Sequence, residues 1–307
     1  MQSRFRSDRR LTVRMGVTLF LLGLLYVAFV AALIVLLKSW VLVVVIAAAV
    51  LAAQYWFSDR IALFAMHGRV VEREECPELH AVVDRLCAMA DMPKPVVAVS
   101  DMGMPNAFAT GRNPDNAVVC VTTGLLRRLE PAELEGVLAH ELSHVAHKDV
   151  AVITIASFLG VIAGLIVRFA FYSELFGGRG RKDQNTLVVF AAVMGVSAAV
   201  YAISFLLIRA LSRYRELAAD RAAALLTGRP SALASALTKV TGDIARIPTK
   251  DLRTAQAFNA FYITPALGSE PGLARLFSTH PSLDQRLEQL GRISAELGEA
   301  ATPGKAG

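Results

Sequence analysis

The residues best suited to catalysis lie in the run His140-Glu141-Leu142-Ser143-His144. A helix is predicted from about Pro131 through this run, so the two imidazoles lie one turn apart on the same face. Both can then bind one Zn²⁺ ion, and Glu141 lies beside the open coordination position as a general base. The alternative is a buried core helix whose two histidines are satisfied by hydrogen bonds. The uncharged residues around the run, among them Val137, Leu138 and Val145, favour a buried metal-bearing helix over a chance match to the pattern.

Glu216 is the candidate for a third ligand. A catalytic zinc site uses three protein ligands and keeps one position exchangeable, so a carboxylate from a second helix completes the set. Asp220 follows one helical turn later and is predicted to accept the outer N–H of a ligating histidine. In the alternative interpretation, Glu216 and Asp220 form a solvated acidic face of a surface helix.

The remaining polar residues near the site are predicted to lie outside it. On a straight helix His147 is about 10 Å along the axis from His140, too far for both to bind one ion together with His144. We therefore expect His147, Lys148 and Asp149 to be polar residues at the membrane interface. His67 and His80 are predicted to be surface histidines.

Four apolar stretches dominate the rest of the chain. Hydrophobic residues make up 54% of the sequence, charged residues 19%, and the mean hydropathy is +0.48. Uncharged stretches near the length that crosses a hydrocarbon core of about 30 Å predict transmembrane helices. They cover residues 15–37, 41–57, 150–167 and 187–208. A signal peptide is the alternative for the first stretch, and buried helices of a soluble core for the last two.

Four spans divide the chain into regions on two sides of a lipid bilayer. We predict a tail and transmembrane hairpin over 1–57, a cytosolic metal-binding region over 58–149, a second transmembrane pair over 150–208 and a cytosolic region over 209–307. The arginine-rich tail of residues 1–14 indicates a cytosolic amino terminus, although the loop 173–186 also carries basic residues. The net charge of +6 is attributed to this orientation, and no nucleic-acid partner is expected.

The predicted spans also give the distance of the metal site from the hydrocarbon edge of the bilayer. If both ligand helices continue straight out of the bilayer, His144 and Glu216 each lie roughly 9–12 Å beyond the hydrocarbon edge. The two halves of the site then meet at one height. An amphipathic helix is also predicted over 76–91, and short strands over 96–100, 106–110 and 117–123.

The assembled motifs resemble those of HtpX-type membrane metalloproteases, relatives of the CAAX prenyl proteases. The resemblance extends over most of the chain and rests on these segments: the early hairpin, Asn106-Ala107-Phe108-Ala109-Thr110-Gly111, residues 122–126, His140 to His144 with Asp149, Arg215-Glu216 with Asp220, and Ser278-Thr279-His280-Pro281 followed by Arg286. It implies a zinc endopeptidase at the cytosolic face of a bacterial inner membrane that degrades misfolded or damaged membrane proteins.

The resemblance also implies roles for individual residues. His140, His144 and Glu216 match zinc ligands, and Glu141 matches the base. His280 matches a histidine that helps to stabilise the tetrahedral intermediate, although a His-Pro helix start explains it equally well. The segment Asn106, Ala107, Phe108 and Ala109 resembles an edge strand that holds substrate, and an ordinary hairpin strand is its alternative. Arg286 and Asp149 receive no definite role.

The sequence therefore predicts an α+β membrane protein. It is mainly helical, with four transmembrane helices and a small β-sheet beside a zincin-type HExxH helix. The expected activity is zinc-dependent endopeptidase action on membrane-protein substrates. Two rivals are an intramembrane-cleaving zinc protease and a non-catalytic membrane scaffold with a structural zinc site. Residues 247–279 are a candidate mobile cover, and neither the natural substrates nor the oligomeric state follows from the sequence.

Overall fold

The computed structural model describes residues 9–36, 66–149, 184–244 and 280–301, with isolated residues and short runs between 45 and 64 and between 152 and 164. The helices are α1 (Arg9–Leu36), α4 (Pro77–Ala90), α5 (Thr123–Arg128), α6 (Pro131–Ala146), α8 (Gln184–Thr227), α9 (Pro230–Ile244) and α11 (Leu283–Ala301). The strands are β1 (Gly68–Val70), β2 (Val96–Ser100), β3 (Ala107–Gly111) and β4 (Ala117–Thr122), with a 3₁₀ turn at Pro114–Asn116.

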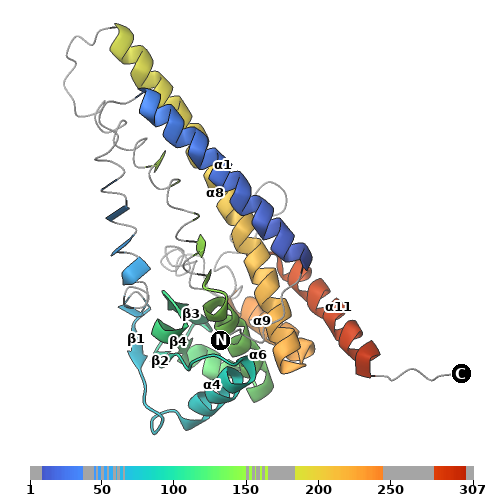
Figure 1. Ribbon diagram of the computed structural model, residues 1–307. Coiled ribbons are helices and arrows are strands. Elements are labelled where there is room, and N and C mark those ends of the chain that lie inside the picture. Colours follow the sequence, from blue (N-terminus) through green and yellow to red (C-terminus); the bar gives the residue numbers. More distant parts are fainter. Residues whose placement is uncertain are drawn as a thin grey trace, which may run out of the picture.

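Helices α1 and α8 run side by side and extend far beyond the small region that holds the sheet, α4, α6 and α9 (Figure 1). Both are long and apolar enough to cross a membrane: the apolar window within residues 11–29 has a mean hydropathy of 1.9, and the one within residues 191–227 a mean hydropathy of 2.2. They contain most of the first and fourth predicted spans. The second and third predicted spans and the loop 173–186 lie largely outside the described residues, so the structure does not test them.

The two long helices run antiparallel. The guanidinium of Arg14 on α1 lies 5.8 Å from the ring centroid of Tyr214 on α8, and further along both helices Leu22 packs with Leu211. Rising numbers in α1 therefore meet falling numbers in α8. Because α8 is one continuous helix, it carries the chain from an apolar segment directly to Glu216, as the sequence predicted.

The sheet has the strand order β1-β2-β4-β3. β2 and β4 pair in parallel, while β1 and β3 are antiparallel to their neighbours. β4 is buried along its whole length, which accounts for its apolar sequence without alternation. β3 is an edge strand. The predicted strands are confirmed to within one residue at each end, and the predicted helix over 76–91 is confirmed as α4.

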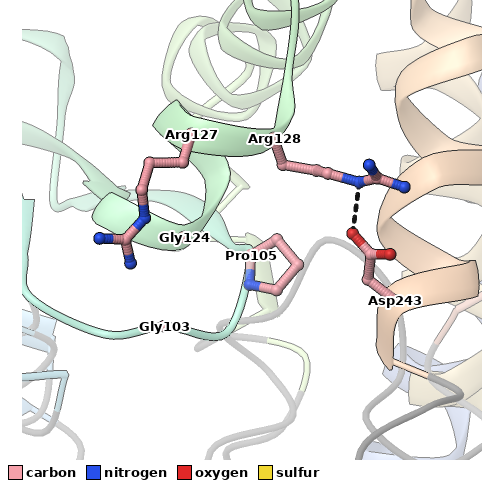
Figure 2. Close-up of a pocket in the computed structure, with 6 residues that line it drawn as sticks. All are labelled: Gly103, Pro105, Gly124, Arg127, Arg128 and Asp243. Atoms are coloured by element: carbon pink, nitrogen blue, oxygen red, sulfur yellow. Dashed lines mark ion pairs between the residues drawn. The ribbon is translucent and has the colours of Figure 1, made fainter.

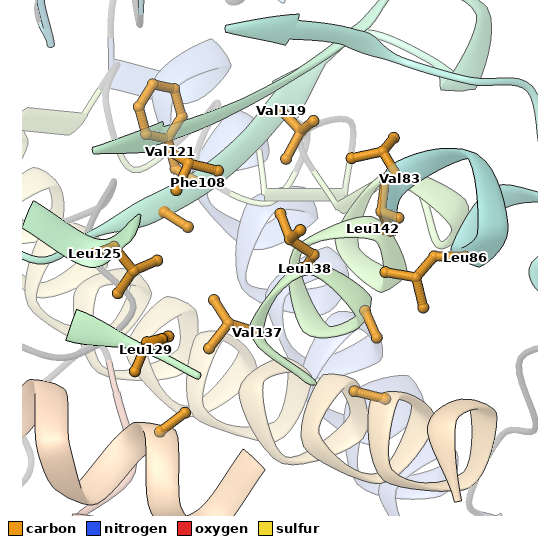
Figure 3. Packing of buried hydrophobic residues seen from close by; sticks show 14 of the residues in the cluster. Val83, Leu86, Phe108, Val119, Val121, Leu125, Leu129, Val137, Leu138 and Leu142 are labelled. Carbon is orange, nitrogen blue, oxygen red and sulfur yellow. The ribbon is translucent and has the colours of Figure 1, made fainter. Parts of the chain in front are cut away.

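Helix α6 packs against the sheet and α4. Pro131 occupies its first turn, and the Glu133 carboxylate accepts the N–H of Glu130 at 2.9 Å, which satisfies a donor at the helix start. Leu138 and Leu142 are completely buried against side chains of β4 and α4 (Figure 3). Truncating such a leucine to alanine typically costs about 2–5 kcal/mol. This packing fixes the helix that carries both histidines.

Helix α9 covers another side of α6 at close range. A Cβ atom added to Gly136 of α6 would lie 3.3 Å from Leu233 of α9, so glycine permits the approach. At the same interface Lys239 lies 2.7 Å from the Glu133 carboxylate, and the hydroxyl of Ser235 donates to it at 2.6 Å. Apolar contact and a polar cluster together hold the start of α6.

Two local predictions were wrong. Helix α6 does not continue straight towards the third apolar stretch: it ends at Ala146, and Lys148 has a φ of 55° in the left-handed region. His80 is buried rather than exposed, since its Nε2 lies 3.0 Å from the carbonyl oxygen of Val71 and Lys94 contacts its Nδ1 at 2.9 Å. Both ring nitrogens are thereby satisfied, which makes burial possible. His67 is exposed as predicted.

Candidate metal centre

His140, His144 and Glu216 come together where α6 meets α8. The two Nε2 atoms lie 3.2 Å apart, and the Glu216 carboxylate oxygens lie 3.6 Å from the Nε2 atom of His140 and 3.5 Å from that of His144. One ligand atom from each residue fits within a group whose members all lie within 4.8 Å of one another. His140 and Glu216 are buried, and His144 is partly exposed.

These separations suit one small divalent cation. Ligand atoms about 2.1 Å from a tetrahedral zinc ion are separated from one another by about 3.4 Å. The Nδ1 atoms of both rings face carboxylates, so Nδ1 carries the proton and the Nε2 lone pairs point at each other. Two converging lone pairs and a carboxylate repel one another unless a cation lies between them. The donor set therefore fits a metal.

His140 is held by a buried pair of charges. Its Nδ1 lies 2.9 Å from Asp220, one turn beyond Glu216 on α8. The guanidinium of Arg286, from α11, donates two hydrogen bonds to the same carboxylate, at 2.7 Å and 2.6 Å. Asp220 and Arg286 are both buried. Arg286, which sequence reasoning left without a role, therefore orients the carboxylate that orients His140.

His144 has a second support of the same kind. Its Nδ1 lies 2.5 Å from Asp149, and the buried guanidinium of Arg215 contacts that carboxylate. The prediction that Asp149 is only an interfacial polar residue was wrong, because the turn after α6 folds it back onto the histidine. Arg215 received no role from the sequence, although its position directly before Glu216 was a signal.

Glu141 faces the edge strand. One of its carboxylate oxygens accepts the backbone N–H of Ala109 at 3.1 Å. The backbone N–H of Thr122 donates to the carbonyl oxygen of Asn106, at the start of the pairing between β3 and β4. Because hydrogen-bonded pairs alternate along an antiparallel ladder, Phe108 and Thr110 bond to β4 in the same way. The N–H and C=O groups of Ala107 and Ala109 therefore point outward. The outward edge of β3 therefore lies directly beside Glu141.

His280 reaches the site from the segment before α11. Its Nδ1 lies 3.2 Å from the Glu216 carboxylate, and the residue is buried. A histidine that only started a helix would not need this position. The structure thus brings His140, His144, Glu216, Asp220, His280 and Arg286 together from separate parts of the chain, with Asp149 against His144 and Ala109 against Glu141.

The comparison with family models decides the relationship. Residues 73–294 match the model of peptidase family M48. The chain belongs to peptidase family M48. The chain is similar to "Protease HtpX homolog 1" of Streptomyces coelicolor, with 89% identity over 306 residues that cover 100% of both chains. "Protease HtpX homolog" of Moorella thermoacetica shares 52% over 301 residues, covering 97% of this chain and 99% of its own.

A solved structure supports the same fold for this M48 chain. The crystal structure of S. mikatae Ste24p superposes with a TM-score of 0.53 and 18% identity, covering 92% of this chain and 67% of that one. The family, the metal-binding group and the long apolar helices together define an HtpX-type membrane metalloprotease, a hydrolase.

The two glutamates of the M48 site, Glu141 and Glu216, have pKa values shifted in opposite directions. Burial raises the pKa of Glu141, and the neighbouring His140 and His144 offset this only in part. Burial also opposes ionisation of Glu216, but the neighbouring imidazoles of His280, His140 and His144 hold its pKa well below the ordinary value. A ligand must stay ionised and a base must be able to take up a proton, so the environments match the two roles.

A separate pocket lies away from the M48 site. It has a volume of about 300 Å³ and is lined by Gly103, Pro105, Gly124, Arg127, Arg128 and Asp243 (Figure 2). Arg128 and Asp243 pair across it at 2.5 Å. None of the metal-centre residues lines this pocket, so it plays no part in the site.

Proposed function

We propose that the protein is a zinc-dependent endopeptidase of the bacterial cytoplasmic (inner) membrane that cleaves misfolded or damaged membrane proteins at the cytosolic face. The observation that carries the proposal is the position of Glu141, which lies between the histidine pair and the outward edge of β3. A peptide bond paired with that edge lies beside both the ligand cluster and a buried carboxylate. This is the arrangement that hydrolysis of an extended chain requires.

The residues of the chain then have distinct tasks. His140, His144 and Glu216 hold the zinc ion, which when bound supplies the positive charge that polarises the scissile carbonyl and acidifies water. Glu141 takes a proton from the attacking water and returns it to the leaving nitrogen. His280 donates a hydrogen bond to the oxygen that becomes negative. Asn106 to Ala109 pair with substrate through the main chain.

The cytosolic orientation rests on the arginines of the first tail, Arg4, Arg6, Arg9, Arg10 and Arg14, which favour a cytosolic amino terminus. In the four-span arrangement, the region with the metal centre lies on the same side as this tail. Zinc is favoured over harder cations because two of the three ligands are imidazoles. The lipid bilayer and unfolded membrane proteins are the expected partners.

Casein hydrolysis by detergent-purified protein, with added zinc and with a chelator, tests this function. We expect zinc-dependent cleavage, and Glu141→Gln should abolish it while zinc still binds. Glu135→Gln is the matched control on the same helix, since Glu135 pairs with Arg85 away from the ligands. Wild-type turnover in Glu141→Gln would refute the assignment of the base. Bound zinc without any hydrolysis by the wild type would favour a structural zinc site, and cuts inside apolar segments would favour an intramembrane protease.

A further inference from the structure

The far end of the edge strand β3 is attached to the end of the second apolar stretch. The hydroxyl of Tyr55 donates to the carbonyl oxygen of Arg112 at 2.9 Å, and the Arg112 guanidinium lies 5.9 Å from the centroid of the Trp56 ring. Arg112 directly follows β3, and the two aromatic rings contact each other edge to face at 6.1 Å. We call Tyr55, Trp56 and Arg112 the aromatic clamp.

The clamp residues have the character of a membrane interface. Tyr55 and Trp56 close an apolar stretch and are followed by Ser58, Asp59 and Arg60. Trp56 is 59% exposed and the adjacent Phe57 is 48% exposed. Exposed amphipathic rings between an apolar segment and charged residues typically lie at the headgroup level of a bilayer. The clamp therefore places one end of β3 at the surface of the membrane.

Two independent path lengths set an upper limit on the height of the active site above that surface. A strand rises about 3.3 Å per residue, so Ala109, which contacts Glu141, lies about 10 Å from Arg112. Along α8, Glu216 lies about 12 Å beyond Ile208, the last residue of the apolar stretch. The length along the strand, about 10 Å, and the length along the helix, about 12 Å, are similar, although the two elements reach the metal centre from different parts of the chain.

We infer that the aromatic clamp makes β3 a ruler, and that the enzyme cleaves extended segments of membrane proteins no closer than a minimum distance from the substrate's own transmembrane helix. A height of about 10 Å corresponds to about three extended residues, which sets the minimum distance of the scissile bond from the last apolar residue. A segment that leaves the bilayer beside Trp56 pairs along β3 and brings this bond to Glu141. The inference rests on the proposed function and specifies its substrate class.

A series of anchored substrates tests the ruler. The full-length protein is placed in vesicles of phosphatidylcholine and phosphatidylglycerol with a single-span substrate, whose cleavable bond lies one to fifteen residues from its last apolar residue. Cut positions are read by mass spectrometry. We expect at least tenfold lower turnover at one or two residues than at three to six, and a decline of several-fold by fifteen as the effective concentration falls. Equal cleavage at every distance would overturn the inference.

Variants of the clamp provide a second test. The measured quantity is a ratio of two turnover rates: that of the anchored substrate whose cleavable bond lies four residues from its last apolar residue, divided by that of the same peptide without an anchor. Trp56→Ala combined with Arg112→Ala should lower this ratio at least fivefold, while Trp56→Phe, which keeps an aromatic ring, should preserve most of it. Arg127→Ala is the matched control, because Arg127 is exposed and lies in the separate pocket. Equal loss on both substrates would contradict the ruler. Failure of the wild type to cleave the unanchored peptide would instead refute the proposed function itself.

Discussion

Asp149 lies 2.5 Å from Nδ1 of His144 although helix α6 ends between the two residues, at Ala146. A continued helix would carry Asp149 away from the metal centre, because residues five apart do not share a face. The turn through Lys148 returns it instead. Replacing Asp149 with asparagine keeps a hydrogen-bond acceptor but removes the charge and leaves Arg215 without its counter-ion.

We therefore expect Asp149→Asn to lower zinc affinity by about 10–100-fold, as is usual when the partner of a ligating histidine is changed. Competition with a chromophoric chelator measures this affinity directly. Asp243→Asn is the control, since it removes an aspartate that pairs with Arg128 far from the ligands and should leave the affinity unchanged. Equal affinities in wild type and Asp149→Asn would show that the contact contributes nothing to metal binding.

Arg286→Met should destabilise the metal-free protein by about 3–5 kcal/mol, because it leaves the buried Asp220 carboxylate without its charged partner. Denaturant or thermal unfolding in the presence of a chelator separates this effect from metal binding. On the same helix, Arg292 is 69% exposed, and Arg292→Met should change the stability by no more than about 0.5 kcal/mol. Similar losses in the two variants would count against a special role for Arg286.

The Glu133 carboxylate gives a pH-dependent contribution to stability. Burial opposes its ionisation, but hydrogen bonds from Lys239 and Ser235 outweigh burial and lower its pKa. A lowered folded-state pKa means that the contribution is present above the unfolded-state pKa and is lost as the pH falls through the folded-state value. Glu133→Gln should thus cost about 1–2 kcal/mol at pH 7.

The difference between wild type and Glu133→Gln should shrink as the pH falls through the lowered folded-state pKa of Glu133, below which the wild-type carboxyl is also neutral. Thermal unfolding of the metal-free proteins between pH 7 and pH 3 measures it. Glu130→Gln is a suitable comparison, since Glu130 lies near the same lysine but its side chain is 77% exposed. A constant difference across this range would mean that the ionised form of Glu133 makes no contribution.

The cysteines should differ in reactivity. Burial raises the pKa of Cys87 to about 11 and that of Cys120 to about 12, whereas Cys76 is half-buried. Because the thiolate is the reactive form, alkylation of folded protein at pH 8 should modify Cys76 roughly a hundredfold faster than the other two. Mass spectrometry of native and unfolded samples reads this ratio. Rapid labelling of Cys120 in folded protein would show that the sheet opens readily.

Local sequence determined the parts of the site that depend on periodicity. Helical spacing alone placed His140 and His144 on one face, and the same argument related Glu216 to Asp220. The apolar runs indicated α1 and α8, and short β-prone runs between turn residues gave the strands. These features depend on contacts between residues that are close together in the sequence, so the sequence pattern is sufficient to predict them.

Only the tertiary structure decided which distant groups meet at the metal centre. Arg286 reaches Asp220, Arg215 reaches Asp149, and the N–H of Ala109 reaches Glu141, in each case across a large separation in sequence. His80 was misjudged for the same reason, since its partners Val71 and Lys94 lie on other segments. A charged or polar side chain becomes buried only when the fold supplies its partner, and the sequence of one segment does not contain that partner.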